Sequence, residues 1–471
     1  MGDPARIVIV GGGYVGSKTG RYLRKHLSGS EAEVTVVDPR SYMTYQPFLA
    51  EAAAGSVEPR HVVVPLREIL PGCRVMAAEA IGIDQRERAV TLRVAGGHIE
   101  QIGYDVLVVA PGSVSRTLPI PGPAEHGVGF KTLEEAIYLR NHGLSRLDQA
   151  ATTMDPELRR RLLTFVFVGR GYAGVEAMAE LEDIPCRSLP IRPQSRRKRV
   201  AASMSAADRV RLLLVGLVTR QALPDYDIEP RELRWVLVEA MGRIMPEVGE
   251  SLATYTVELL SRRGFEIHLN TTLKSAEDSH VVLGSDDAGT EFDADTIVWT
   301  AGVKPSPWLV DTGLPLDERG RIRCSTTLEV EDSPGVFAAG DSAAVPDVTK
   351  DDPDAVCPPS AQHATRQAAQ LAKNIIATLR GRPLGHYRHA NAGSVASLGL
   401  YQGVPQIYGV KLCGFPAWLL HRGYHLATMP TVHRKARIAA DWLLSLPFKR
   451  QVVATSEQHE PRRQFARASQ G

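Results

Sequence analysis

Apolar and polar residues follow two different periods along the chain, and together they predict strands that alternate with helices. Short continuous apolar runs, rich in β-branched residues, are typical of strands buried in a parallel sheet. Two such runs, at 6–10 and 164–168, are each followed by a glycine-rich turn and a helical stretch, at 17–26 and 175–182. Strand, helix and strand in alternation predict an α/β fold with parallel sheets.

The first glycine-rich turn has the spacing of a dinucleotide-binding loop. Gly11, Gly13 and Gly16 follow the first strand, and the next strand ends in Asp38, 22 residues beyond Gly16. In such loops the first glycine permits a tight turn, the second lets the backbone approach a pyrophosphate, and the third lets helix and strand pack closely. The helix start then offers N–H groups to the phosphates, and the acid accepts hydrogen bonds from the ribose hydroxyls. We expect one dinucleotide here.

A second loop of the same kind follows the strand at 164–168. Gly169, Gly171 and Gly174 keep the spacing, and a later strand at 234–238 ends in Glu239. A carboxylate at that position favours NAD, because it would repel the 2′-phosphate of NADP. Two loops in one chain imply two dinucleotides, and FAD with NAD(P)H is the simplest pair.

Two features depart from the usual pattern of the second loop. Arg170 places a bulky cation in a variable slot, where it either contacts phosphate or obstructs it. The distance from Gly174 to Glu239 is 65 residues, against a usual spacing of roughly 20. We assign the excess to an inserted loop at about 184–224, because its prolines should end the preceding helix after Asp183.

Charge and cysteine content exclude several functions. The 55 Lys and Arg residues nearly balance 53 Asp and Glu, so no global positive field favours nucleic acid. The five cysteines include no CxxC or CxxxxC pair, which argues against a thiol redox centre or a metal site and favours a reducing compartment. No apolar run reaches the 18 residues of a transmembrane helix.

Three further stretches carry a family resemblance. The stretch 329–341 reads as a strand that ends in a turn at Gly340 and Asp341, where a carboxylate can hold the ribityl chain of a flavin. Crossover strands return at 104–112, with Ala110 and Gly112, and at 295–305, with Gly302. This order resembles the flavoproteins with two dinucleotide-binding domains. Within them the chain is most similar to type II NADH:quinone oxidoreductases of an actinobacterial form, through AQHATRQ at 361–367, TAGVK at 300–304 and KLCGFPAW at 411–418, in which Cys413 replaces the usual residue.

The resemblance implies two Rossmann-like domains, with the FAD domain interrupted by the NAD domain. The implied boundaries are 1–118 and 303–410 for the two parts of the FAD domain, 119–302 for the NAD(H) domain, 411–454 for C-terminal membrane-associating helices and 455–471 for a disordered tail.

The resemblance also implies a hydride relay from NADH to FAD, followed by transfer of two electrons to a membrane quinone, menaquinone or ubiquinone, without proton pumping. Glu176, in the first turn of the second nucleotide-binding helix, would lie near the reacting rings and organise protons. Lys411 would pair with Glu176 or with the quinone. Gln362 and Gln367 would flank the quinone head. Each of these residues also has a purely structural interpretation. Glu176 would then be an ordinary carboxylate at a helix start, Lys411 a solvated surface lysine, and the two glutamines part of the polar face of a helix.

The C-terminal region suggests contact with lipid. In a helix expected at 433–446, Ala439, Trp442, Leu443 and Leu446 fall on one stripe, with Arg and Lys residues around it. Such an element is typical of an interfacial anchor on an anionic lipid surface, which would place the protein peripherally on the cytoplasmic face of the membrane. Packing of the stripe on the protein itself, or in a homodimer formed through this region, remains open.

Two other functions stay open. One is a degenerate or regulatory FAD-binding paralogue with impaired NADH binding, which Arg170 and the insertion suggest. The other is a related NAD(P)H-dependent flavin reductase with a different acceptor. Sulfide:quinone oxidoreductases share the architecture but need paired redox cysteines, and none are evident here.

Overall fold

The computed structural model describes residues 3–186, 226–284, 289–389, 393–407, 410–445, 448 and 453. Nearly all of the expected insertion at 184–224 and the whole expected tail at 455–471 lie outside the described residues. Within the described residues the chain forms two compact units. The first unit falls in the stretches 1–45, 63–116 and 303–392, and the second in 46–62, 117–302 and 393–471.

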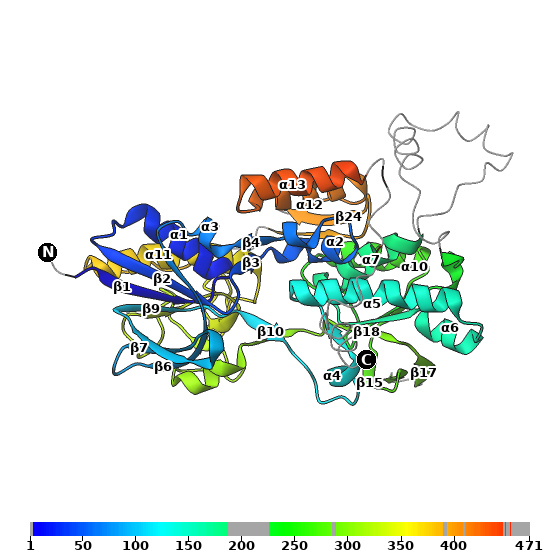
Figure 1. Cartoon of the computed structure of the whole chain (residues 1–471), viewed down its shortest axis with the longest axis horizontal. Coiled ribbons are helices and arrows are strands. Elements are labelled where there is room, and N and C mark those ends of the chain that lie inside the picture. Colours follow the sequence, from blue (N-terminus) through cyan, green and yellow to red (C-terminus); the bar gives the residue numbers. More distant parts are fainter. Residues whose placement is uncertain are drawn as a thin grey trace, which may run out of the picture. The chain divides into compact units, whose positions relative to one another are not determined.

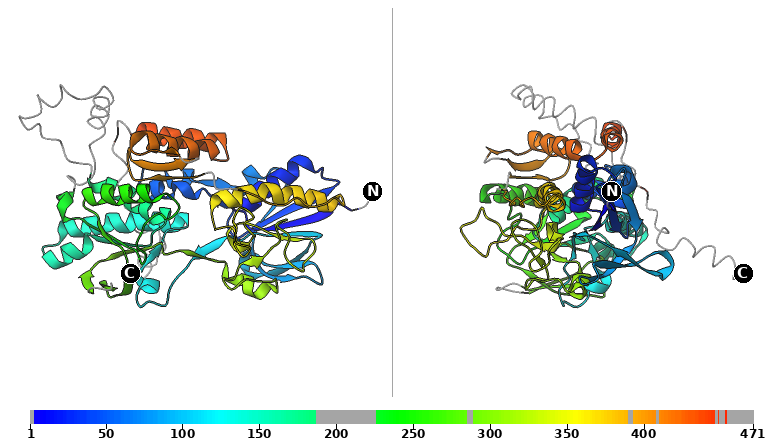
Figure 2. Two further views of the ribbon diagram at one scale, coloured as in Figure 1. Left: turned by 180° about the vertical axis from the view of Figure 1, so that it is seen from behind. Right: turned by 90° about the vertical axis from the view of Figure 1, so that its left-hand side faces the viewer.

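The first unit is built on a parallel sheet of five strands in the order β21-β9-β1-β2-β5. Its strands are β1 (Ala5–Val10), β2 (Ala32–Asp38), β5 (Arg74–Ala77), β9 (Val106–Val109) and β21 (Val336–Ala338). Every residue of β9 is buried, as expected of a strand covered on both faces. Helix α1 (Tyr14–His26) packs along α11 (Ala361–Leu379), and the views from two sides show them next to each other (Figures 1 and 2).

The second unit repeats this arrangement. Its parallel sheet has the order β11-β18-β12-β13-β14. The strands are β11 (Val128–Gly129), β12 (Thr164–Val168), β13 (Arg234–Val238), β14 (Glu266–His268) and β18 (Thr296–Trp299). Helices α5 (Leu133–Thr152), α7 (Tyr172–Cys186) and α10 (Glu250–Arg262) lie against this sheet. In both sheets the strand before the glycine-rich loop therefore lies between a returning strand and the strand that ends in an acid.

Each unit also contains a three-stranded antiparallel meander. In the first unit it is formed by β6 (Glu79–Asp84), β7 (Ala89–Arg93) and β8 (Ile99–Gly103); in the second, by β15 (Thr272–Glu277), β16 (His280–Gly284) and β17 (Thr290–Asp293). The repeated order of parallel sheet and meander confirms the predicted α/β fold with two Rossmann-like domains.

Smaller elements complete the first unit. Antiparallel pairs join β3 (Tyr42–Thr44) to β4 (Val63–Pro65) and β10 (Ser113–Ser115) to β19 (Val303–Pro305), a parallel pair joins β20 (Ile322–Arg323) to β22 (Ala343–Ala344), and α3 (Leu66–Ile69) follows β4. In the second unit the short helices are α2 (Leu49–Ala53), α4 (Pro123–His126) and α6 (Pro156–Leu162). The segment 46–62, which includes α2, belongs to the second unit although it lies between strands of the first in sequence.

The C-terminal region packs on the second unit. An antiparallel sheet of β23 (Gly393–Ser397), β24 (Gly403–Ile407) and β25 (Val410–Lys411) packs against α12 (Phe415–Thr428), and α12 in turn contacts α13 (Val432–Leu444). Figure 1 shows the two helices in orange and red. Helix α13 confirms the helix expected at 433–446 to within two residues. Helix α7 ends at Cys186, beyond the end expected after Asp183, so Pro185 lies within its last turn.

The stripe expected on α13 does not lie on one outward face. Trp442 turns toward the body of the unit: its ring meets Phe48 edge to face, 5.7 Å between centroids, and its indole N–H donates to Glu51 Oε2 over 3.1 Å. Leu443, by contrast, is 66% exposed. Packing on the protein itself, one of the alternatives left open by the sequence, is therefore what Trp442 shows, because the helical period gives the angular position of a side chain and not the surface that it meets. Leu446 lies outside the described residues.

Candidate functional site

The first glycine-rich loop bends sharply and leaves one side of its backbone open. At Gly11, with φ of +103°, a Cβ would lie 2.2 Å from the carbonyl oxygen of Ala110. At Gly16 a Cβ would lie 1.8 Å from the carbonyl oxygen of Gly11, so neither position has room for a side chain. Around a Cβ at Gly13 no atom lies within 4 Å. The backbone there is accessible to a bulky group, as a pyrophosphate site requires.

Asp38 stands at the carboxyl end of β2, beside this loop. Its Oδ2 accepts from the backbone N–H of Gly12 (2.7 Å), and its Oδ1 accepts from that of Arg40 (2.8 Å). Because a carboxylate has about four acceptor positions, both oxygens keep capacity for ribose hydroxyls. The two backbone bonds hold the carboxylate against the glycine-rich loop.

The remaining residues expected at the flavin site meet at the same end of the sheet. Gly112, with φ of +75°, follows Ala110 at the end of β9. The Ser113 hydroxyl donates to Asp341 Oδ2 over 2.6 Å, and a Cβ at Gly340 would lie 2.9 Å from Val15 of α1. The first unit thus brings all eight residues predicted for FAD to one edge: Gly11, Gly13, Gly16, Asp38, Ala110, Gly112, Gly340 and Asp341.

The second loop repeats this geometry in the second unit. Gly169 has φ of +124°, and a Cβ there would lie 2.6 Å from the carbonyl group of Thr300. At Gly174 a Cβ would lie 2.3 Å from Thr300 Oγ1. Around Gly171, as around Gly13, no atom lies within 4 Å of an added Cβ. The second unit therefore offers a second open backbone of the same shape.

Glu239 occupies the position in the second unit that Asp38 has in the first. Its Oε1 accepts from the backbone N–H two residues later, at Met241, over 2.8 Å. Burial raises the pKa of Glu239, and the positive charge of Arg170 opposes that rise. Gly302, with φ of +96°, ends the turn after β18 and donates its N–H to the Thr300 carbonyl over 2.8 Å.

A buried carboxyl group lies one turn into α7. Glu176 Oε1 accepts from the backbone N–H of Ser397 over 2.8 Å and lies 3.4 Å from His421 Nε2 of α12. Burial, reinforced by the negative charge of Glu180, raises the pKa of Glu176 to about 8, although the bond from Ser397 opposes the rise. A carboxyl group with that pKa carries its proton at neutral pH and can donate it.

The other three candidates have different partners. Lys411 Nζ donates to Ser251 Oγ over 2.8 Å. The ion pair expected with Glu176 is not formed among the described residues, where Glu176 instead meets a histidine. Gln362 Oε1 lies 2.8 Å from His389 Nε2, and the buried Gln367 accepts from the backbone N–H of Gly340 over 2.7 Å. The assignment of both glutamines to a quinone site stays a prediction.

The chain is similar to known proteins. The family model for pyridine nucleotide-disulphide oxidoreductases matches residues 5–368. The chain belongs to the pyridine nucleotide-disulphide oxidoreductase family. Type II NADH:quinone oxidoreductases from Staphylococcus saprophyticus and Staphylococcus aureus are each 26% identical to this oxidoreductase over 414 residues, which is 88% of this chain and 92% of theirs. They confirm the resemblance drawn from the sequence.

Solved structures show the same fold. NDH2 from Plasmodium falciparum in complex with NADH superposes on this oxidoreductase with a TM-score of 0.80 at 14% identity, covering 95% of this chain and 99% of that one. The sulfide:quinone oxidoreductase of Aquifex aeolicus superposes with a TM-score of 0.65 at 15% identity, covering 93% of this chain and 92% of that one.

Several polar residues of these sites were not identified from the sequence. Ser113 holds Asp341, Ser397 holds Glu176, and His389 contacts Gln362. The contact of His421 with Glu176 was not predicted either. Ser113 could have been found from the sequence, because it directly follows the end of a predicted strand. No local pattern links Ser397 to Glu176, which is 221 residues away.

Proposed function

We propose that this chain is a type II NADH:quinone oxidoreductase that carries FAD in the first unit and binds NADH in the second. The observation that carries the proposal is the pair of open loops, each with a buried carboxylate held beside it. The 26%-identical relatives named for this activity, which match almost the whole chain, support the choice of acceptor. When bound, FAD accepts hydride from NADH and passes two electrons on to the quinone.

The residues of the chain bind and orient these groups. Helices α1 and α7 begin directly after the two open loops, so the N–H groups at their starts would suit phosphate oxygens. Asp38 and Glu239 would bind the ribose hydroxyls of the two nucleotides. The Ser113 hydroxyl fixes the Asp341 carboxylate where it would hold the ribityl chain of the flavin. Glu176, protonated at neutral pH, would hold a proton beside the reacting rings.

Two valine substitutions at the open glycines test the two nucleotide sites separately. Gly13 has φ of −68°, so a side chain there is tolerated by the backbone and meets only open space. Gly13→Val should give a folded protein without bound flavin. Gly171→Val should keep the yellow colour of FAD but lose reduction of the flavin by NADH.

The decisive assay measures NADH oxidation by wild-type protein with and without a short-chain menaquinone or ubiquinone. Turnover that requires the quinone supports the proposal. A yellow protein that binds NADH without any turnover would support the degenerate paralogue instead, and turnover only with a non-quinone acceptor would support a flavin reductase. If Gly13→Val retained flavin, the first loop would not be the FAD site.

The chain would meet its quinone at a lipid surface through the C-terminal helices. Among the described helices, none combines the length and the hydropathy of a transmembrane span. Helices α12 and α13 nevertheless expose large apolar side chains, among them Leu419, Val432, Leu443 and Leu444, and Arg437 is exposed beside them. Apolar side chains next to cations suit the interface of an anionic bilayer, on the cytoplasmic face if NADH is drawn from the cytoplasm.

Flotation with vesicles tests this lipid contact. Wild-type protein should float with anionic vesicles and stay behind with zwitterionic ones at moderate salt. A double variant, Leu443→Ser with Leu444→Ser, should bind less, whereas Met154→Ser, which removes a fully exposed apolar side chain from the loop after α5, should not change binding. If the double variant instead changed the oligomeric state measured by sedimentation, the exposed apolar side chains of α13 would form a homodimer interface.

A further inference from the structure

Two histidines of α12, His421 and His425, form a line of neighbouring side chains that ends at the buried Glu176. The side chain of His421 is 2% exposed, and its Nε2 faces Glu176 Oε1 at 3.4 Å. Its Nδ1 is buried and has no hydrogen-bond partner within the described part of the chain. An imidazole can accept a proton on one nitrogen while it releases the proton on the other. His421 is therefore oriented for proton transfer rather than locked by bonds on both sides.

His425 extends this line by one helical turn toward solvent. The ring centroids of His421 and His425 lie 4.5 Å apart, with an interplanar angle of 65°. His425 keeps partial exposure, and its ring also meets Phe48 and Tyr424 edge to face. The spacing of four residues on one helix places both imidazoles on the same face.

The charged groups around this line come from several elements. On α7, Glu180 lies close enough to affect the pKa values of Glu176 and His421. On α12, Arg422 follows His421 and forms an ion pair with Glu51 of α2 over 3.2 Å. Tyr172, at the start of α7, has its pKa raised, mainly by burial.

The two histidines stay neutral in these surroundings. Burial and the charge of Arg422 lower the pKa of His421 to about 4, and burial lowers that of His425. The uncharged form can both accept and donate a proton, so both rings start in the state that a relay needs.

The proposed reaction requires a path by which protons reach the buried Glu176 from solvent. Oxidation of NADH by a quinone follows NADH + H⁺ + Q → NAD⁺ + QH₂, in which the hydride carries both electrons and one proton. The second proton comes from solvent in every turnover. A buried carboxyl group that donates this proton must be reprotonated before the next turnover.

We propose that His425 and His421 deliver the solvent proton consumed in each turnover to Glu176. This inference rests on the proposed function. The Glu176 O–H bond breaks as the quinone oxygen gains its proton. The Nε2–H bond of His421 then breaks as the carboxylate is reprotonated, and His421 Nδ1 takes a proton from His425, which is resupplied by solvent. No electrons move in these steps. His421 acts through Glu176 and does not itself meet the substrate.

The test compares two electron acceptors in the His421→Gln holoenzyme. Ferricyanide takes electrons without protons, so turnover with ferricyanide does not need the path. Turnover with a short-chain quinone should fall about tenfold or more, while turnover with ferricyanide stays near the wild-type rate. The remaining quinone turnover should decrease as pH rises, should show an increased solvent isotope effect and should recover when imidazole is added. The wild-type rate should change little over the same pH range.

Two other variants keep the test decisive. His425→Phe, at a partly exposed position, should lower quinone turnover in the same selective way even if His421→Gln folds poorly. His433→Gln, an exposed histidine on α13, should leave both activities unchanged. An equal loss with both acceptors, or no loss with quinone, would overturn the path while leaving the proposed function intact. A wild-type protein without any quinone turnover would overturn both.

Discussion

Gln367 accepts a hydrogen bond from the backbone N–H of Gly340 over 2.7 Å, and its side chain is 1% exposed. Gly340, with φ of +77°, opens the turn that presents Asp341. The thiol of Cys357 also hydrogen-bonds to Gln367. A glutamine that the family pattern assigns to quinone therefore also supports the turn at the flavin site.

Gln367→Ala should weaken flavin binding. The substitution leaves the N–H of Gly340 without its acceptor, which costs about 1–2 kcal/mol and corresponds to roughly a tenfold loss of affinity if the turn loosens. Titration of apoprotein with FAD measures the dissociation constant. Gln370→Ala, one turn further along α11, should leave it unchanged. If flavin affinity were normal and only the KM for quinone rose, the assignment to quinone would be the better one.

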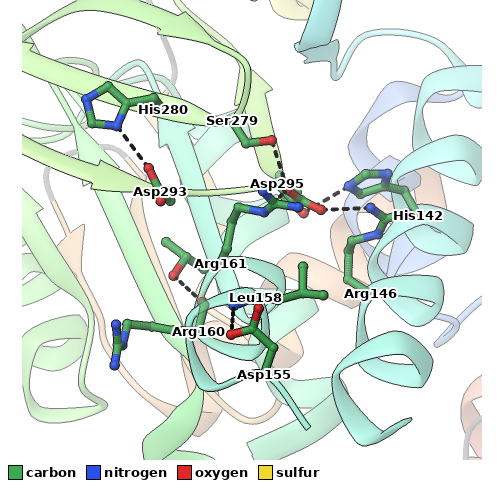
Figure 3. A network of polar contacts seen from close by, with 12 residues as sticks. His142, Arg146, Asp155, Leu158, Arg160, Arg161, Ser279, His280, Asp293 and Asp295 are labelled. Atoms are coloured by element: carbon green, nitrogen blue, oxygen red, sulfur yellow. Dashed lines mark hydrogen bonds and ion pairs between the residues drawn. The ribbon is translucent and has the colours of Figure 1, made fainter. Parts of the chain in front are cut away.

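Asp295 forms ion pairs with two arginines of the second unit (Figure 3). Its Oδ2 lies 2.8 Å from Arg146 Nη1, its Oδ1 lies 2.9 Å from Arg161 Nε, and the Ser279 hydroxyl donates to it over 2.9 Å. The carboxylate is only 9% exposed. It precedes β18 and links this strand to α5 and α6.

Asp295→Asn should destabilise the second unit by about 2 kcal/mol, because two partly buried guanidinium groups lose their counter-charge. The thermal midpoint should fall by roughly 4 °C. The nearby Asp293, 60% exposed and paired with His280 over 2.9 Å, provides a matched control. Asp293→Asn should change stability by less than about 0.5 kcal/mol. Equal effects of the two variants would show that burial of the Asp295 network contributes little.

The sequence predicted those features of the fold that local patterns determine. These patterns are runs of buried strand residues, the spacing of glycines and acids at strand ends, and each is contained in a short stretch of sequence. Asp38 accordingly lies beside the glycine-rich loop that begins at Gly11. The alternation of strand, glycine-rich loop, helix and strand also predicted an α/β fold with two dinucleotide-binding units, which the two parallel sheets confirm.

Contacts between distant stretches could not be predicted in this way. The partner of Glu176 is a histidine on a helix near the end of the chain, and not Lys411. Periodicity placed Trp442 on a stripe but did not show that α13 lies against segment 46–62. Both contacts depend on how the C-terminal region packs, which neither helical period nor charge pattern specifies.

Glu239→Arg should shift the nucleotide preference from NADH toward NADPH. Replacing the carboxylate removes its repulsion of the 2′-phosphate and adds a cation that can bind it. The ratio of kcat/KM for NADH to that for NADPH should fall at least about tenfold, as expected for a change of roughly 1.4 kcal/mol or more. Glu247→Arg makes the same charge change at an exposed position nearby and should leave the ratio unaltered. An unchanged ratio in Glu239→Arg would show that Glu239 does not contact the nucleotide.

His142 makes the second unit sensitive to acid. Its Nε2 lies 3.0 Å from Thr296 Oγ1, and burial together with the charge of Arg146 lowers its pKa from 6.5 to about 4. In the unfolded chain the imidazole takes up a proton below pH 6.5, whereas in the folded unit it stays neutral until about pH 4. Protonation therefore favours the unfolded chain within that window.

The contribution of His142 should be present in full above pH 6.5 and should be lost as pH falls toward 4. Between pH 8 and pH 5 this loss amounts to about 2 kcal/mol. Thermal midpoints measured at the two pH values should therefore differ less in His142→Gln than in wild-type protein, because glutamine does not titrate. His126→Gln, at an exposed position on α4, should keep the wild-type difference. If His142→Gln and wild-type protein lost the same stability between pH 8 and pH 5, acid sensitivity would arise at other groups, such as the histidines of α12.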